Sequence, residues 1–178
     1  MLEYLRRMAR YNQWVNRKLF AGAAQLPDAA IQQDRGAPYG SILGTLNHIF
    51  VADVLWLIRF GSHEACHPLG PVGDIPKPTS LSEVIFSDLE DMTAPRDRLD
   101  DLIVDFSKTW TDEMLNVMIG YHTLSEIKQE HPLGELLQNF FNHQTHHRGQ
   151  ATALLRQAGV DVGSLDLEAM LMEERAAA

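Results

Sequence analysis

The stretch from residue 132 to about residue 158 constrains the fold more than any other part of the chain. Apolar residues recur in it at spacings of three and four, which is the pattern of a helix with one face in a core. Pro132 suits the first turn of this helix, and Gly159 suits the position just beyond its end. The expected core-facing positions, two of them histidines, are Leu133, Leu136, Leu137, Phe140, His143, His147, Ala151, Leu154 and Leu155.

Residues 2 to about 25 and residues 41 to 61 are predicted to form the first two helices. Both carry apolar residues at helical spacing, and Ser41 is a good N-cap for the second. Residues 62 to 79 are rich in proline and are predicted to form a long surface loop.

Residues 80 to about 107 are predicted to form the third helix. Ser80 with Glu83 makes a capping box, and Pro95 predicts a kink or break. Apolar and polar residues then alternate, so a short hairpin is expected between residues 109 and 131.

Four long helices in a chain of 178 residues favour one all-α domain, residues 1–178, folded as a four-helix bundle. The bundle is expected to have a long loop between helices two and three and a short hairpin-like insertion before helix four. A further short helix is expected at about residues 165 to 172.

Charge and cysteine content narrow the function. The net charge is −9 and no Lys/Arg-rich block is present, which disfavours nucleic acid and anionic membranes as partners. The longest apolar run, residues 49–58, is too short to span a bilayer, and no secretory leader is visible. Cys66 is the only cysteine, so no internal disulfide forms and a cytoplasmic location is expected.

His143 and His147 are one helical turn apart and project about 40° from each other, so both can reach one transition-metal ion. His146 falls outside this sector. Two buried histidines, each hydrogen-bonded to its own neighbour, are the alternative, but a shared ion satisfies both rings at once. His48, on the second helix, is the candidate third ligand. Three protein ligands with an open position are typical of catalytic zinc sites.

A competing metal motif lies in the loop after the second helix. His63, Glu64 and His67 fit the H-E-x-x-H pattern of zinc metallopeptidases. That pattern needs the middle of a helix, whereas here it lies between Gly61 and Pro68. The metallopeptidase reading is therefore the weaker one.

The chain resembles the DinB family, a DinB/YfiT-like group of metal-binding four-helix bundles. The residues that carry the resemblance are Tyr11-Asn12-Gln13-Trp14-Val15-Asn16, Leu46-Asn47-His48-Ile49 with Asp53 and Trp56, His131-Pro132-Leu133-Gly134-Glu135-Leu136, and Asn142-His143 through Gln150. They cover nearly the whole chain in the expected order.

The resemblance implies that His48, His143 and His147 bind one divalent ion, nickel or zinc, and that the protein is a homodimer. The leading hypothesis is a metal-dependent enzyme, a transferase or hydrolase, whose open site takes a low-molecular-weight thiol or another small molecule. Some relatives are thiol-dependent transferases or isomerases. The alternative is a non-enzymatic metal-binding or interaction protein in which the ion links two helices.

Other residues near these motifs have smaller expected roles. Asp53 and Gln150 are candidates for orienting the imidazoles, although Asp53 fits a solvated surface charge equally well. Tyr11 and Trp14 are expected to pack in the core. Cys66 has no visible activating cation and is not expected to be reactive.

Overall fold

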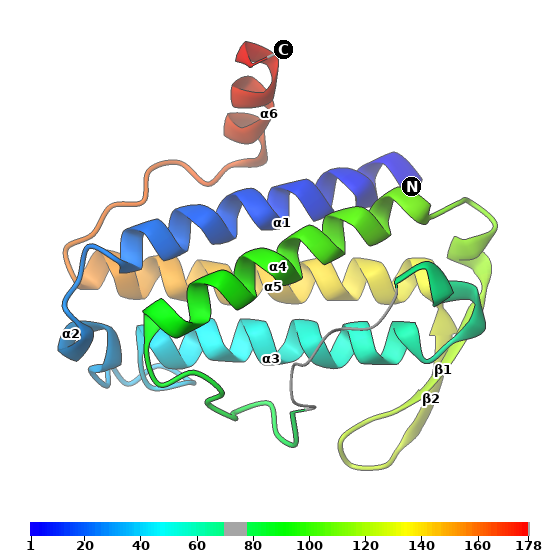
Figure 1. Ribbon diagram of the computed structural model, residues 1–178, viewed down its shortest axis with the longest axis horizontal. Helices are drawn as coiled ribbons and strands as arrows, with labels where there is room; N and C mark the ends of the chain where they lie inside the picture. The colour runs from blue at the N-terminus through cyan, green and yellow to red at the C-terminus, as the bar shows by residue number, and fades with distance from the viewer. Residues whose placement is uncertain (70–77, 178) are drawn as a thin grey trace.

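The computed structural model describes residues 1–69 and 78–177 and is mostly helical, as expected. Its elements in chain order are α1 (Leu2–Ala23), α2 (Asp28–Gln32), α3 (Ile42–Gly61), the 3-10 helix η1 (Glu64–Leu69), α4 (Leu89–Thr109), the 3-10 helix η2 (Met114–Asn116), β1 (Met118–His122), β2 (Lys128–Pro132), α5 (Leu133–Gln157) and α6 (Leu167–Ala176). The long helices α1, α3, α4 and α5 lie side by side, and α6 projects from the side of α1 (Figure 1).

Helix α3 is the central element of the core. It begins where the sequence predicts, because the Ser41 hydroxyl accepts a hydrogen bond from the Gly44 N–H, and it ends at Gly61. Its 20 residues would suffice to cross a bilayer, but 78% of its most apolar window is buried within the protein. Such burial is typical of a helix in the core of a protein. The charged Asp53 within this helix is also fully buried.

The third long helix, α4, begins nine residues later than the sequence predicts. Ser80 does not cap it; Asp88 does, by accepting from the Asp91 N–H at 2.8 Å. Asn47 holds the preceding segment outside the helix, because its Oδ1 accepts from the N–H groups of Ile85 and Phe86. This capture by a side chain of α3 overrides the local capping signal.

Pro95 does not break α4, which continues through it to Thr109. The proline lies in the second turn, so the helix loses the hydrogen bond of only one N–H there. The expected hairpin is present as antiparallel strands β1 and β2, with Met118 opposite Pro132 and His122 opposite Lys128.

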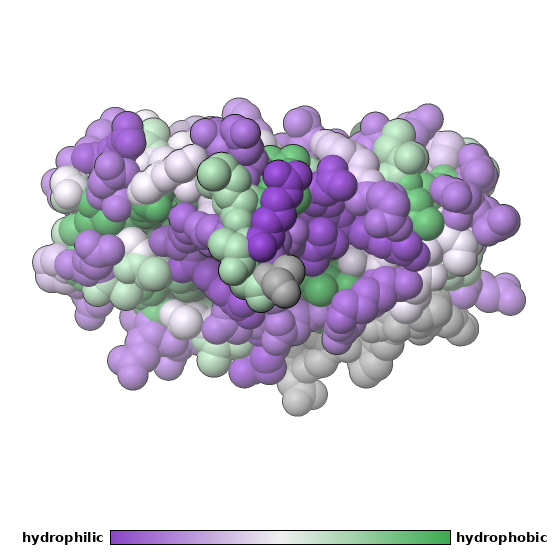
Figure 2. All heavy atoms as spheres, turned by 90° about the horizontal axis from the view of Figure 1, so that it is seen from above, coloured by the Kyte–Doolittle hydropathy of each residue, from purple (hydrophilic) through white to green (hydrophobic). Residues whose placement is uncertain are grey.

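Helix α5 confirms the predicted run, and Gly159 follows it with a φ of 88° that favours glycine. Its buried face is wider than the apolar stripe, because Gln144 and Arg148 are buried as well. The surface seen from the side of α1 and α6 is largely hydrophilic, with apolar residues in small separate groups (Figure 2).

A buried polar layer links the four long helices. Arg96 of α4 donates to Asp53 of α3 at 2.7 Å and to Asp100 at 2.8 Å. Gln144 of α5 donates to Asp53 at 2.6 Å, and Asn16 of α1 donates to Asp100 at 2.9 Å. Asp53 is therefore neither a surface charge nor a hydrogen-bond partner of a histidine; it anchors this layer. The layer fixes α5 against α3, next to the predicted histidine site.

Candidate metal centre

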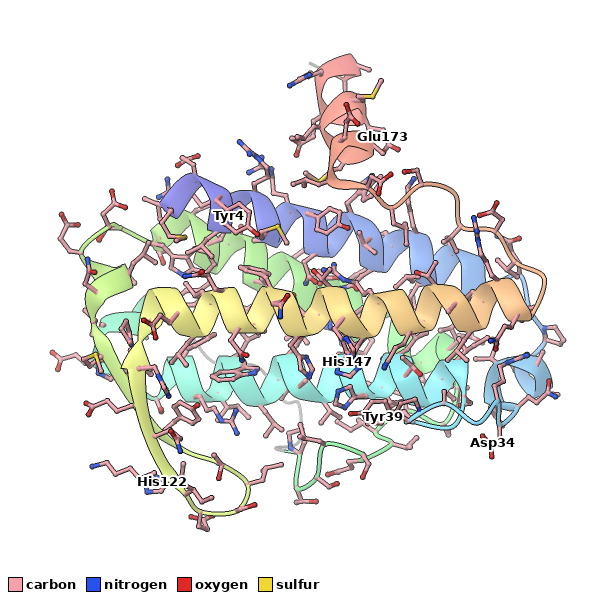
Figure 3. The ribbon with its side chains drawn as sticks, turned by 180° about the vertical axis from the view of Figure 1, so that it is seen from behind. Tyr4, Asp34, Tyr39, His122, His147 and Glu173 are labelled. Atoms are coloured by element: carbon pink, nitrogen blue, oxygen red, sulfur yellow. The ribbon has the colours of Figure 1, made fainter. Side chains whose placement is uncertain are left out.

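The three histidines singled out in the sequence come together between α3 and α5. One nitrogen from each of His48, His143 and His147 lies within 4.8 Å of the others. His48 and His147 are buried, and His143 is half-buried. Figure 3 shows His147 between the two helices, with Tyr39 beside it. The spacing of one turn on α5 thus meets a partner on α3, as expected.

Hydrogen bonds fix which nitrogens of two of these rings face one another. His48 Nδ1 lies 2.7 Å from the Leu81 carbonyl oxygen, and His147 Nδ1 lies 2.8 Å from Gln150 Oε1. Both oxygens only accept, so each Nδ1 carries a proton and each neutral ring has its lone pair on Nε2. The two Nε2 atoms are 3.2 Å apart. Two facing lone pairs repel, which calls for a cation between them.

A proton is a poor candidate for that cation. Burial lowers the pKa of His48, His143 and His147, in the case of His143 to about 4. The neighbouring histidines lower the pKa of His48 and His143 further, because a positive charge on one ring disfavours a second charge on the ring beside it. The three rings are therefore neutral near pH 7, which is the form that binds metal.

The donor set fits a divalent ion. A tetrahedral ion with metal–nitrogen bonds of about 2.0–2.1 Å holds two ligand nitrogens about 3.3 Å apart. The His48 and His147 Nε2 atoms have nearly that separation. Each also donates its other ring N–H to an oxygen, which is the usual arrangement around metal-binding histidines.

Tyr39 is a site residue that the sequence did not reveal. Its ring stacks on His48 with centroids 3.7 Å apart and meets His147 edge-on at 5.6 Å. It lies in the loop before α3, where no periodicity marks a side chain as facing the core. The role of the Leu81 carbonyl is hidden for a related reason, because the sequence predicts that residue 81 lies in a helix.

Gly44 allows the Tyr39 loop to lie this close to α3. A Cβ at Gly44 would overlap the Tyr39 carbonyl oxygen, which is backbone and cannot rotate away. We expect Gly44→Ala to lower the free energy of unfolding by about 1–3 kcal/mol and to weaken metal binding by shifting Tyr39. Gly149→Ala is the control, because a Cβ there meets nothing within 4 Å. Urea unfolding and metal titration of both variants check this; equal behaviour would contradict it.

The remaining candidates lie apart from this centre. His146 is exposed, and its Nε2 contacts Gln150 at 3.3 Å. His63 directly precedes η1 and Glu64 begins it, so neither lies within an α-helix, and the His67 side chain lies outside the described residues. Cys66 is fully buried and burial raises its pKa to about 11, which agrees with an unreactive thiol.

Comparison with known proteins identifies the family. The model of the DinB family matches residues 1–176. The chain belongs to the DinB family. Protein DinB of Bacillus subtilis (strain 168) is 28% identical over 159 residues, which cover 89% of this chain and 88% of that protein. The uncharacterized protein YrdA of the same organism is 39% identical over 93 residues, 52% of this chain and 48% of YrdA.

A solved structure agrees with the fold. The crystal structure of a DinB-like protein from Bacillus cereus ATCC 10987 superposes with a TM-score of 0.57 and 22% sequence identity. The match covers 87% of this chain and 91% of that one. At this identity it supports the DinB-like fold, while the three-histidine centre rests on the geometry of this chain.

Two aromatic residues of the matching motifs pack as expected. Tyr11 and Trp14 of α1 are partly buried against the core. The Tyr11 hydroxyl donates to the Leu165 carbonyl at 2.6 Å, and the Trp14 indole donates to Glu173 at 2.7 Å. In this DinB-family chain the two side chains hold the C-terminal segment and α6 against α1.

Proposed function

We propose that this DinB-family protein binds one divalent cation through His48, His143 and His147 and is a metal-dependent enzyme. The observation that carries the proposal is the pair of Nε2 atoms of His48 and His147, 3.2 Å apart with both Nδ1 atoms already engaged. Nickel and zinc are the proposed ions because the family resemblance implies them, and imidazole ligands suit both.

The half-buried side of the centre is where chemistry would take place. His143 has the greatest exposure of the three histidines and its side chain makes no hydrogen bond within the described residues, so a small molecule can approach from its side. When bound, the ion supplies a Lewis acid that lowers the pKa of a coordinated water or thiol. Leu81 and Gln150 hold the two buried imidazoles in orientation, and Tyr39 covers the His48 ring and shields it from water.

The family resemblance supports a more specific form of the proposal. In this form of the proposal, the protein is a thiol-dependent transferase that acts on a small molecule and uses a low-molecular-weight thiol as co-substrate. A hydrolase is the second possibility. A homodimer in the cytoplasm is part of the same proposal. The open position beside three neutral imidazoles is consistent with a thiolate as an additional ligand.

A structural ion is the alternative function. The burial of His48 and His147 favours it, because an ion there joins α3 to α5 as a cross-link. In that case the protein is a non-enzymatic metal-binding or interaction protein.

Metal removal distinguishes the two functions. We expect that chelation lowers the melting temperature and abolishes thiol-dependent turnover in a screen of low-molecular-weight thiols with small electrophiles. Nickel or zinc should restore both, in wild type and in the exposed-site control His146→Ala. A large loss of stability without an exchangeable water or thiol ligand on the metal would instead support the structural role.

A further inference from the structure

The C-terminal half of α3 lies beside the β1–β2 hairpin (Figure 1). A pocket separate from the histidine centre is lined by residues of these two elements. Its volume is about 650 Å³, within the range of small-molecule sites. Leu55 and Ile58 of α3 and Leu124 of the hairpin give it an apolar wall, the rest of its lining is mostly polar, and Arg59 brings a positive charge. None of the three candidate metal ligands lines it. The pocket therefore has an apolar wall and one guanidinium.

Arg59 is held between two aromatic rings. Its guanidinium carbon lies 4.8 Å from the Trp56 ring centroid and 5.0 Å from that of Tyr121. Burial lowers the pKa of this guanidinium, so the cation has lost part of its hydration. Within residues 1–69 and 78–177, no hydrogen bond or ion pair compensates that loss, and its nitrogens are not among the fully enclosed ones. Among the described residues, therefore, no acceptor engages its N–H groups.

Packing alone accounts for only part of this arrangement. A cation–π contact uses the faces of the guanidinium and of the rings, and it fastens the hairpin to α3. The five N–H donors point outward in the guanidinium plane and match a carboxylate. Glu126 also lines the pocket, but among the described residues its carboxylate makes no ion pair with Arg59. His122, a further titratable side chain of the hairpin at this pocket, is exposed.

We propose that this pocket binds a small organic carboxylate that has an apolar body. The carboxylate pairs with the Arg59 guanidinium, and the apolar body packs on Leu55, Ile58 and Tyr121. Thr79 and Thr123 line the same pocket and add polar surface to it. Arg59 follows His48 by three helical turns on the same face of α3, about 16 Å along the axis. The site therefore opens on the same side of α3 as the histidine centre, but it binds without the ion.

Benzoate and its neutral analogue benzamide test the proposal as matched probes on the full-length chain. Calorimetric titration should show benzoate binding at least about tenfold more tightly than benzamide, the value of a charge-assisted pair. Arg59→Met should reduce benzoate affinity to that of benzamide, and Arg98→Met, at an exposed arginine of α4, should leave it unchanged. Glu126→Gln removes a negative charge that lines the pocket and would repel a carboxylate, so it should strengthen benzoate binding and leave the Trp56–Arg59–Tyr121 contacts intact.

Two results separate the pocket from the metal centre and from misfolding. Benzoate should still bind to His48→Ala, which disables the proposed metal site; loss of binding there would show that the carboxylate binds at the histidines and would overturn the proposal. The circular dichroism spectrum and melting curve of Arg59→Met report whether the hairpin stays docked. Equal affinities for benzoate and benzamide in wild type, or unchanged or weaker benzoate binding in Glu126→Gln, would also overturn it.

Discussion

Replacing Arg96 by methionine is expected to lower the free energy of unfolding by about 3–5 kcal/mol, the usual cost of breaking a buried ion pair from one side. Arg96 is 2% exposed and donates to both Asp53 and Asp100, which are equally buried. Methionine fills the space but leaves the two carboxylates without their direct ion-pair partner. The buried polar layer that fixes α5 against α3 then lacks the arginine that joins its two carboxylates.

The pH dependence of this effect has a defined sign. Burial raises the pKa of Asp100 from 3.8 to about 6, although Arg96 opposes the shift. The folded protein then holds a proton that the unfolded chain has released, so stability falls as pH rises from about 4 to 6. Without Arg96 the pKa rises further and the loss extends to higher pH. Arg96→Met should therefore lie nearer to wild type at pH 5 than at pH 8.

Urea unfolding at the two pH values measures this, with Arg98→Met as the control. Arg98 is exposed on the same helix, and its side chain makes no hydrogen bond or ion pair among the described residues, so its replacement should change stability by less than about 0.5 kcal/mol. An Arg96→Met variant as stable as the control would show that the buried layer does not hold the helices together.

Replacing any one of His48, His143 and His147 by alanine is expected to weaken metal binding by more than about 100-fold. Loss of a residue that merely orients a ligand already costs about 10–100-fold. Gln150→Ala should fall in that smaller range, because Gln150 accepts from His147 Nδ1. Gln150→Glu keeps an acceptor and should bind metal like wild type.

His146→Ala and His63→Ala are the matched controls for this series. His146 is adjacent to His147 but exposed, and His63 belongs to the competing motif at η1. Competition with a coloured chelator measures all affinities. Wild-type affinity in the three ligand variants, or a loss of metal in His63→Ala, would contradict the proposed site.

Local sequence patterns predicted the helices and the helix faces on which the histidines lie. Periodicity places α1, α3 and α5 within about two residues of their observed ends, since each helix has one continuous apolar face. The same periodicity puts His143 and His147 on the face that meets α3. His48 is predicted as the third ligand because it is the only histidine on the first three predicted helices.

Tertiary contacts decided what local patterns missed. The segment around Ser80 has good helix-start signals, yet Asn47 holds residues 85–86 outside the helix, and the freed Leu81 carbonyl accepts from His48. From the sequence alone, Gln144 and Arg148 are polar residues expected at the surface. In the structure they are buried, because Gln144 donates to Asp53 and Arg148 donates to the Asn12 backbone carbonyl. Such partners lie on other helices, where periodicity along one helix carries no information.

X-ray absorption spectroscopy of the zinc- or nickel-loaded protein, combined with its metal-to-protein ratio, tests the central claim most directly. One ion per chain with three imidazole ligands at about 2.0–2.1 Å, and light-atom scatterers in the remaining positions of the metal-loaded resting protein, is the predicted result. A sulfur ligand at about 2.3 Å, which only Cys66 or a methionine could supply within the chain, would contradict the three-histidine centre. So would a ratio well below one at saturating metal.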